Sequence, residues 1–517
     1  MVRGKRFNGA KGFGIAPPLV RSALWNYLGY FCELCAGALL IAYVVRRVPV
    51  EDYGIYVLAQ SIASILLVLD FGLSGVLVPL YSWTLTSKGM AEAGKLASTL
   101  ILSLLGLGTL GATVLSLLAF ALPEMMNLPS AHTALVLKLL ILAAVTVQFT
   151  IPSVALDCFY QASHRFDRLS QVQISMLLLR VGLTVAVVGT GSGIVAIAVV
   201  RALVSFAQLV ILWVVVRLEI SGPSLQLLRF DRAQLPRVLK VTGWAFGGDL
   251  AQRIGVISEK LILAGLCSFG QVAMFGLASR LPEHFVQFAG QGLSVLTPSL
   301  SRNHSEGNRT QMREIYRNAC SACLTGVMPL VVFAAICAKP IMEVWGGRSY
   351  SNAGMVMVWL LILALSRILE HPNELVLYSH NRVRAAARIR AVETVGKIGL
   401  ALALAVPFGA AGVAAGVAVC HWCVNLFLYL PEACRAAEMR PWELLREAAT
   451  GNLRLIAAFA VGAGALAWCS HYSTVPVSVG GFVVVSFIYA ALWFGFTSLP
   501  IRGAAQRDVA PVLRESE

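Results

Sequence analysis

The chain has 517 residues, of which 58% are hydrophobic and only 13% are charged. Soluble proteins carry about 25% charged residues, so this composition, with a mean hydropathy of +0.76, excludes a secreted protein, a cytosolic enzyme and a nucleic-acid-binding protein. The chain is predicted to be an all-α polytopic membrane protein, and the net charge of +15 is expected to reflect its orientation in the membrane.

Fourteen segments are apolar enough to cross the hydrocarbon core, which takes about 20 residues of helix. In chain order they are 23–44, 55–79, 96–121, 134–157, 170–189, 193–215, 242–266, 272–299, 317–338, 355–378, 390–406, 409–430, 453–470 and 477–498. Glycine, proline and polar residues separate these segments. The fifth and sixth are separated only by the run Gly189–Gly193, whose three glycines predict a tight turn.

These segments predict two lobes of six helices followed by two further helices. The expected parts are a cytoplasmic tail (1–22), a first lobe (23–216), a cytoplasmic interfacial linker (217–241), a second lobe (242–430), a cytoplasmic interfacial segment (431–452), helices thirteen and fourteen (453–498) and a cytoplasmic tail (499–517). A weak internal repeat supports equal lobes, because Tyr53-Gly54-Ile55 in the second segment matches Phe275-Gly276-Leu277 in the eighth. Such a repeat would place a cavity between the lobes.

The lysine and arginine residues orient the segments. With the N-terminus in the cytoplasm, 29 of the 41 fall in cytoplasmic parts and 5 fall in external loops. This distribution follows the positive-inside rule. Both termini are therefore predicted to be cytoplasmic, and all external loops are short.

Cations also occur inside the predicted segments, where each costs roughly 2.5–3.5 kcal/mol near a helix centre. They are Arg180, Arg201, Arg253, Lys260, Arg280, Arg367 and Lys397. Such residues usually face the protein interior or water, although Lys260 and Lys397 lie nearer helix ends, where their side chains can reach the interface. Arg253, Arg280 and Arg367 fall near mid-membrane. Because a guanidinium presents a planar fork suited to phosphate, a wet chamber lined by them would attract pyrophosphate.

Carboxylates share helix faces with these arginines. These carboxylates would limit how long an anion stays bound, or would bind a coupling ion. They are Asp249, Glu283, Glu370 and Glu374. Pro372 is expected to break the tenth segment beside them. The alternative is that the charges pair with each other inside the membrane: Arg253 with Asp249, Arg280 with Glu283, and Arg367 with Glu370.

Neither a metal ion nor another cofactor is predicted. Three Cys-x-x-Cys pairs lie in apolar runs, where cysteine packs as a small apolar residue: Cys32/Cys35, Cys320/Cys323 and Cys420/Cys423. A zinc site needs four converging ligands, and His421 alone adds to these cysteines.

The stretch from Arg46 to Tyr56, which reads RRVPVEDYGIY, is followed by Leu69-Asp70-Phe71-Gly72-Leu73. This pattern resembles the opening of the Wzx-type polysaccharide flippases, which belong to the multidrug/oligosaccharidyl-lipid/polysaccharide exporter superfamily. In that family the first external turn typically has a basic residue, an acidic residue and Tyr-Gly, and the second helix ends near Asp-x-Gly-Leu. The resemblance in sequence motifs covers about residues 20–80, and the resemblance in helix architecture covers the whole chain. Val48-Pro49 departs from the usual Leu-Gly.

The resemblance implies two six-helix lobes around a central cavity, plus two C-terminal helices. It also implies a flippase that moves a polyprenyl-pyrophosphate-linked oligosaccharide across the bacterial inner membrane by alternating access. The product would serve exopolysaccharide, O-antigen (lipopolysaccharide) or capsule biosynthesis. On this sequence the pyrophosphate contacts would be Arg253, Arg280, Arg367, Arg201 and Arg180. The expected partners are the lipid-linked oligosaccharide, the lipid bilayer and a polysaccharide polymerase with its co-polymerase, but no nucleic acid.

Two other functions remain open. A small-molecule or drug antiporter of the same superfamily would have a lumen richer in acidic residues, whereas the mid-membrane excess here is cationic. A membrane enzyme of polysaccharide assembly would need a catalytic loop, and no external loop is long enough. The sequence leaves open the glycan, the pathway, the coupling ion and the oligomeric state.

Overall fold

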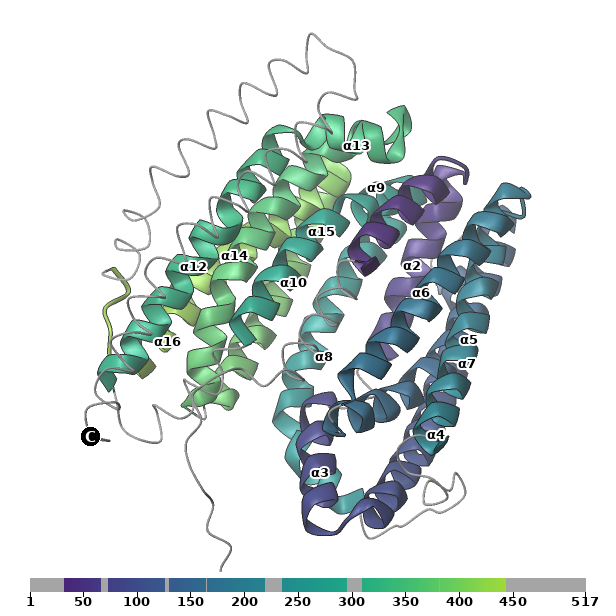
Figure 1. Cartoon of the computed structure of the whole chain (residues 1–517). Coiled ribbons are helices and arrows are strands. Elements are labelled where there is room, and N and C mark those ends of the chain that lie inside the picture. Colours follow the sequence, from purple (N-terminus) through teal and green to yellow (C-terminus); the bar gives the residue numbers. More distant parts are fainter. Residues whose placement is uncertain are drawn as a thin grey trace, which may run out of the picture. The chain divides into compact units, whose positions relative to one another are not determined.

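The computed structural model of the chain describes residues 32–66, 73–125, 130–163, 165–218, 235–294, 309–380 and 382–442, and these form helices and short connections (Figure 1). Six helical stretches among them are long and apolar enough to cross a membrane: Met90–Glu124, His132–Ala162, Arg168–Gly189, Gly193–Val216, Ala353–Ser379 and Val383–Ala437. The predicted all-α membrane fold is confirmed. The predicted helices thirteen and fourteen and both tails lie outside the described residues.

The helices form two compact units, and the first contains residues 32–44 and five labelled helices. These are α3 (Leu73–Ser87), α4 (Met90–Met125), α5 (Ser130–Ala162), α6 (Phe166–Gly189) and α7 (Gly193–Val216). Helix α5 is central, because it packs against the other four. Buried aromatic rings join α3 to α5, where Tyr81 and Phe159 meet edge to face with centroids 5.2 Å apart. The Tyr43 hydroxyl donates to the Val185 carbonyl oxygen at 3.3 Å.

The predicted break between the fifth and sixth segments is confirmed. Helix α6 ends at Gly189 and α7 begins at Gly193. Gly191 and Gly193 have φ values of 76° and 72°, a conformation that glycine adopts without steric cost.

The second unit contains α2 (Val50–Leu66) and the helices that follow residue 243. These are the main part of α8 (Leu235–Leu266), then α9 (Phe269–Ala278), α10 (Arg280–Ser294), α12 (Arg309–Ile336), α13 (Ala338–Gly346), η5 (Arg348–Tyr350), α14 (Ala353–Ser379), α15 (Val383–Val424), the π-helix η6 (Asn425–Tyr429) and α16 (Leu430–Ala437). Helix α14 is the centre of this unit, since it packs against α9, α10, α12, α13, α15 and α16. The predicted linker 217–241 lies mostly outside the described residues, and its last residues begin α8.

Residues 55–79, predicted as one segment, contribute to two helices in different compact units. Helix α3 packs against α4 and α5, whereas α2 packs against α9. Glycine permits the close approach of α2 and α9, because a Cβ on Gly54 would lie 1.9 Å from the Phe269 carbonyl oxygen and a Cβ on Gly276 would lie 2.5 Å from Val57 Cγ1. The division into lobes at 23–216 and 242–430 remains a prediction.

The breaks predicted in the second half have mixed outcomes. The gap between the eleventh and twelfth segments is confirmed as a kink inside α15, where Gly409 has φ 57° and follows Pro407 closely. The break predicted at Pro372 is wrong, because α14 continues through it to Ser379. A proline removes one backbone hydrogen bond, and packing on several neighbours holds the rest of a membrane helix in place. The predicted eighth segment is two helices, α9 and α10, joined at Ser279.

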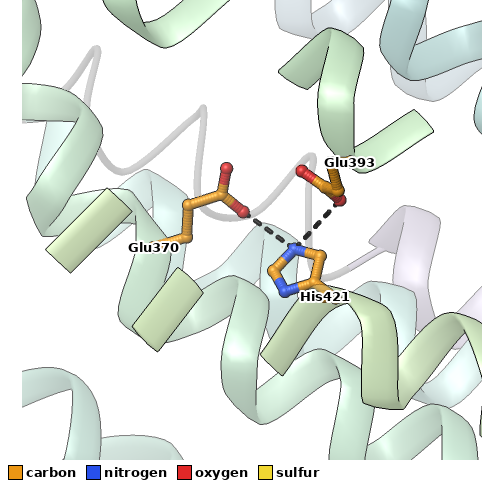
Figure 2. A group of neighbouring side chains, drawn as sticks. All are labelled: Glu370, Glu393 and His421. Carbon is orange, nitrogen blue, oxygen red and sulfur yellow. Dashed lines mark ion pairs between the residues drawn. The ribbon is translucent and has the colours of Figure 1, made fainter. Parts of the chain in front are cut away.

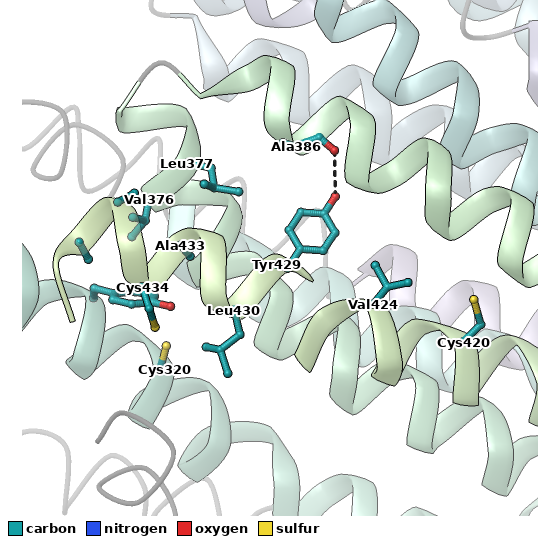
Figure 3. Close-up of a cluster of buried hydrophobic side chains, with 13 residues drawn as sticks. Cys320, Val376, Leu377, Ala386, Cys420, Val424, Tyr429, Leu430, Ala433 and Cys434 are labelled. Carbon is teal, nitrogen blue, oxygen red and sulfur yellow. Dashed lines mark hydrogen bonds between the residues drawn. The ribbon is translucent and has the colours of Figure 1, made fainter. Parts of the chain in front are cut away.

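A buried apolar cluster joins the end of α15 to α12, α14 and α16 (Figure 3). The Tyr429 hydroxyl donates to the Ala386 carbonyl oxygen at 3.4 Å, and Cys320 and Cys434 are free thiols packed in this cluster. The cysteines therefore pack here as small apolar side chains. Helix α16 covers the predicted interfacial segment from 431 to 437, and residues 443–452 lie outside the described residues.

Candidate functional site

A polar cavity lies inside the second unit, between α8, α9, α10, α14 and α15. It contains about 800 Å³ of empty space, counting the part that is open to its surroundings. Its charged lining residues are Glu259, Lys260, Glu283, Arg367, Glu370, Arg390, Glu393, Lys397 and His421. Because helices that are apolar on most faces converge on so many charges, this cavity is the best candidate for a functional site in the described residues.

Two carboxylates and an imidazole meet on one wall of the cavity (Figure 2). His421 Nε2 lies 2.9 Å from Glu370 Oε2 and 3.6 Å from Glu393 Oε1. All three residues are buried. Helices α14 and α15 supply them, and the kink at Gly409 separates the part of α15 that carries Glu393 from the part that carries His421.

This triad has the donor types of a metal site, since one ligand atom from each residue lies within 4.8 Å of the other two. However, the Lys397 ammonium already forms an ion pair with Glu393. A divalent ion would therefore be held beside a fixed positive charge, which weakens its binding in a medium of low dielectric constant. The triad is a poor fit for a divalent metal.

Other charged side chains of the cavity interact at longer range. Neither Lys260 nor Arg367 forms a close ion pair or a hydrogen bond with a residue that the structure describes, and Lys260 is only 8% exposed. Lys260 interacts electrostatically with Glu259 and Glu283, and Glu259, which is 7% exposed, also interacts with Arg367 and Lys397. Charges without a close partner are costly to bury, so they indicate a space that holds water or a polar ligand.

The predicted arginines lie in different surroundings. Arg367 lines the cavity and does not pair with Glu370, contrary to the ion-pair alternative. Arg253 instead donates from Nη1 to the Ser64 carbonyl oxygen of α2 at 2.9 Å. Arg280 lies beside the Tyr53 hydroxyl, and its buried Nε lacks a hydrogen-bond partner in the described part of the chain.

The remaining predicted residues are spread over both units. Arg180 and Arg201 belong to α6 and α7 in the first unit. Glu283 and Glu370 line the cavity, and Glu374 pairs with Arg390 through an Nε–Oε1 contact of 3.1 Å. The side chain of Asp249 lies outside the described residues.

Sequence reasoning missed several residues of the cavity. The sequence analysis did not select Glu393 or His421 as site residues. The i,i+4 spacing of Glu393 and Lys397 on α15 could have indicated Glu393. The expectation that Lys260 and Lys397 reach the interface is wrong, since both line the buried cavity. An isolated histidine in an apolar run carries no such signal.

The family model described as "Polysaccharide biosynthesis protein" matches residues 44–354. No curated protein matches the chain. Among solved structures, the chain is similar to the lipid II flippase MurJ in an inward closed conformation, with 12% identity, a TM-score of 0.66 and coverage of 92% of this chain and 99% of that one.

Multidrug transporters have the same fold. An inward-facing MATE family transporter of the MOP superfamily has 13% identity, a TM-score of 0.65 and coverage of 82% of this chain and 99% of that one. A mutant of the Vibrio cholerae MATE transporter VcmN has 16% identity, a TM-score of 0.56 and coverage of 81% and 95%. These similarities confirm the fold that the resemblance predicted. Because the family model covers more than half of its residues, this chain belongs to the polysaccharide biosynthesis protein family.

Proposed function

We propose that the chain is a flippase that moves a polyprenyl-pyrophosphate-linked oligosaccharide across the bacterial inner membrane for cell-surface polysaccharide assembly. Its family and its transporter fold support this function. The observation that carries the proposal is the cavity, in which Lys260 and Arg367 form no close ion pair or hydrogen bond with a described residue. Basic groups without a close partner can contact a phosphorylated lipid headgroup.

In this proposal the pyrophosphate contacts Arg367 and Lys260 in the cavity. Arg253 and Arg280, with Arg180 and Arg201 of the first unit, contact it at other stages of its passage. The sugar remains in the polar space and the polyprenyl tail remains in the bilayer. Alternating access by rocking of the two lobes would move the headgroup across the membrane.

A coupling ion would act through the carboxylates near these cations, which are Asp249, Glu283, Glu370 and Glu374. Both termini are proposed to be cytoplasmic, and the distribution of basic residues supports this orientation. The flipped product would pass to a polysaccharide polymerase and co-polymerase. The pathway would then be that of exopolysaccharide, O-antigen (lipopolysaccharide) or capsule.

A small-molecule antiporter is the second candidate, because MATE transporters have the same fold. The two candidates differ in the charge of the substrate. Lys260 and Arg367 would contact an anionic headgroup, whereas Glu259 would hold a cationic drug.

The test uses the full-length protein in proteoliposomes with a fluorescent polyprenyl-pyrophosphate-linked disaccharide. Arg367→Ala and Lys260→Ala should each slow flipping roughly 10- to 100-fold, the loss expected for one charge-assisted hydrogen bond. Arg388→Ala is the matched control, since Arg388 is an exposed arginine of α15. Unchanged flipping in both cavity variants would contradict the assignment. Efflux of a cationic dye without flipping of the lipid would favour the antiporter.

A further inference from the structure

The surface of the second unit changes from apolar to charged where η6 meets α16. The exposed side chains of η6 are those of Leu426, Phe427 and Leu428, and Phe427 is 74% exposed. A few residues later, Glu432 and Arg435 give α16 a charged surface, and the Arg435 side chain is 75% exposed. Exposed apolar side chains of a membrane helix contact lipid tails. This change therefore marks the depth at which lipid headgroups lie, and it coincides with the predicted end of the twelfth segment at residue 430.

The apolar and charged side chains follow one side of the continuous helix. Phe427, Pro431 and Arg435 are spaced by four residues, which places them roughly above one another. Leu430 and Ala433 are on the other side and pack in the buried apolar cluster (Figure 3). One lipid molecule can therefore contact Phe427 with a tail and Arg435 with its headgroup.

Glu432 aligns two guanidinium groups at this depth. Arg382 Nη1 lies 2.7 Å from Glu432 Oε1, and Arg435 Nη1 lies 3.3 Å from Glu432 Oε2. Each guanidinium has five N–H donors, and the contact with Glu432 uses one donor of each. The remaining donors of two neighbouring planar forks suit the oxygens of a phosphate group.

Helix α16 is held in place at its other end by α12. Arg313 Nε donates to the Ala437 carbonyl oxygen at 3.0 Å, and its Nη2 lies 3.1 Å from Glu438 Oε2. Arg309 also pairs with Glu438. Because these contacts fix α16 before a ligand arrives, little further ordering of the backbone opposes binding.

The charge of the group around Glu432 indicates which phosphate it suits. Two guanidiniums and one carboxylate have a formal charge of +1. The phosphodiester of phosphatidylglycerol has a single negative charge and would neutralise this group. Phosphatidylethanolamine adds an ammonium group, which the guanidiniums would repel, and a pyrophosphate would leave excess negative charge beside Glu432.

We propose that Arg382, Arg435 and Phe427 form a binding site for one anionic phospholipid of the phosphatidylglycerol type. The phosphodiester contacts both guanidiniums, and one acyl chain lies along Phe427. The bound lipid joins the start of α15 to α16 and so stabilises the second unit. In the proposed orientation the site faces the cytoplasmic leaflet, where anionic lipids attract basic residues. The site is separate from the cavity, so this lipid is not the transported molecule.

The first test measures lipid binding by native mass spectrometry of the full-length protein, with phosphatidylglycerol and phosphatidylethanolamine of identical acyl chains. The wild type should prefer phosphatidylglycerol, and Arg382→Gln and Arg435→Gln should each lower this preference about fivefold. Arg165→Gln is the matched control, because Arg165 is an exposed arginine on the same predicted side of the membrane. It should keep the wild-type preference.

A second pair of variants tests the contact with the acyl chain. Phe427→Ala should weaken binding of both lipids and leave their ratio unchanged. Phe408→Ala should change neither, although Phe408 is also an exposed phenylalanine, 66% exposed on α15. Equal weakening by both substitutions would show general contact with lipid and would overturn the site.

Three other results would overturn the proposal. These are equal binding of the two lipids to the wild type, an equal loss of preference in Arg165→Gln, and displacement of phosphatidylglycerol by an equal concentration of polyprenyl pyrophosphate. The last result would reassign the surface to the substrate. All of these measurements report binding alone, so they hold whether or not the chain flips a lipid-linked sugar.

The melting temperature provides a readout that also checks folding. Without added lipid, the variant with both Arg382→Gln and Arg435→Gln should melt close to the wild type, because surface ion pairs contribute little to stability. Added phosphatidylglycerol should raise the melting temperature of the wild type, since a ligand of the folded state stabilises it, and should raise that of the double variant less. An equal rise in both proteins would refute the site.

Discussion

The contact between α2 and α9 depends on two glycines, and adding one methyl group to either tests it. A Cβ on Gly54 would lie 1.9 Å from the Phe269 carbonyl oxygen and 2.7 Å from its carbonyl carbon. These are backbone atoms, which cannot rotate away. A Cβ on Gly276 would instead lie 2.5 Å from Val57 Cγ1, which belongs to a side chain with few rotamers.

The expected cost follows from this difference. Overpacking typically costs about 1–3 kcal/mol, and replacing a helical glycine by alanine returns about 1 kcal/mol through helix propensity. Gly54→Ala must push two helices apart, so we expect a net loss of about 2 kcal/mol. Gly276→Ala should cost less, because Val57 yields in part. Gly399→Ala on α15 is the control, since its Cβ would meet no atom within 4 Å.

The assay is the apparent melting temperature of the full-length protein in one detergent. Gly54→Ala should melt about 4 °C lower, Gly276→Ala should be intermediate, and Gly399→Ala should equal or exceed the wild type. Val57→Ala should rescue Gly276→Ala but leave Gly54→Ala unchanged, because it makes room only beside Gly276. If Gly54→Ala melts as high as Gly399→Ala, the close approach of α2 and α9 is not present in the protein.

Other substitutions test the site and its support. Arg280→Ala and Arg367→Ala should each slow flipping of lipid-linked sugar roughly 10- to 100-fold, while the protein still accumulates in the membrane fraction. Full activity in both variants would contradict the pyrophosphate contacts. Asn373 accepts a buried hydrogen bond from the Tyr316 hydroxyl and donates one to Asn425 Oδ1. Asn373→Ala removes both, so its melting temperature should fall by the equivalent of about 2–4 kcal/mol. Asn352→Ala replaces an exposed helix-start residue without a side-chain cap and should melt like the wild type. Gly409→Ala forces φ 57° on a residue with a side chain and crowds a neighbouring amide, so it should lower the melting temperature by the equivalent of about 1–2 kcal/mol.

Local conformation explains which features of the fold the sequence could predict. The turn at Gly189–Gly193 and the kink at Gly409 were predictable, because positive φ values select glycine at those positions whatever packs around them. Pro372 was misleading, since a proline ends a helix only where no neighbouring helices hold both sides of it. Packing decided that outcome, and packing cannot be inferred from one helix alone.

The cavity was harder to predict for a related reason. Arg367 and Glu370 were expected to matter because charges are rare in membrane helices. The partners of such charges depend on which helix faces meet, and a helix that is apolar on most sides gives no signal of its buried face. Glu393 and His421 lie on two parts of α15 that only the kink at Gly409 separates, and Lys260 comes from α8. Their meeting is a property of the assembled second unit.

The contact between α2 and α9 also joins the two copies of the internal repeat. Gly54 belongs to the tripeptide Tyr53-Gly54-Ile55, and Gly276 belongs to Phe275-Gly276-Leu277; each glycine meets the helix that carries the other. Because both methyl groups would act on the same helix–helix distance, separation of the helices for one makes room for the other. Gly54→Ala and Gly276→Ala together should therefore lower the melting temperature by less than the sum of the single effects. Strict additivity would show that the two glycines do not share one contact.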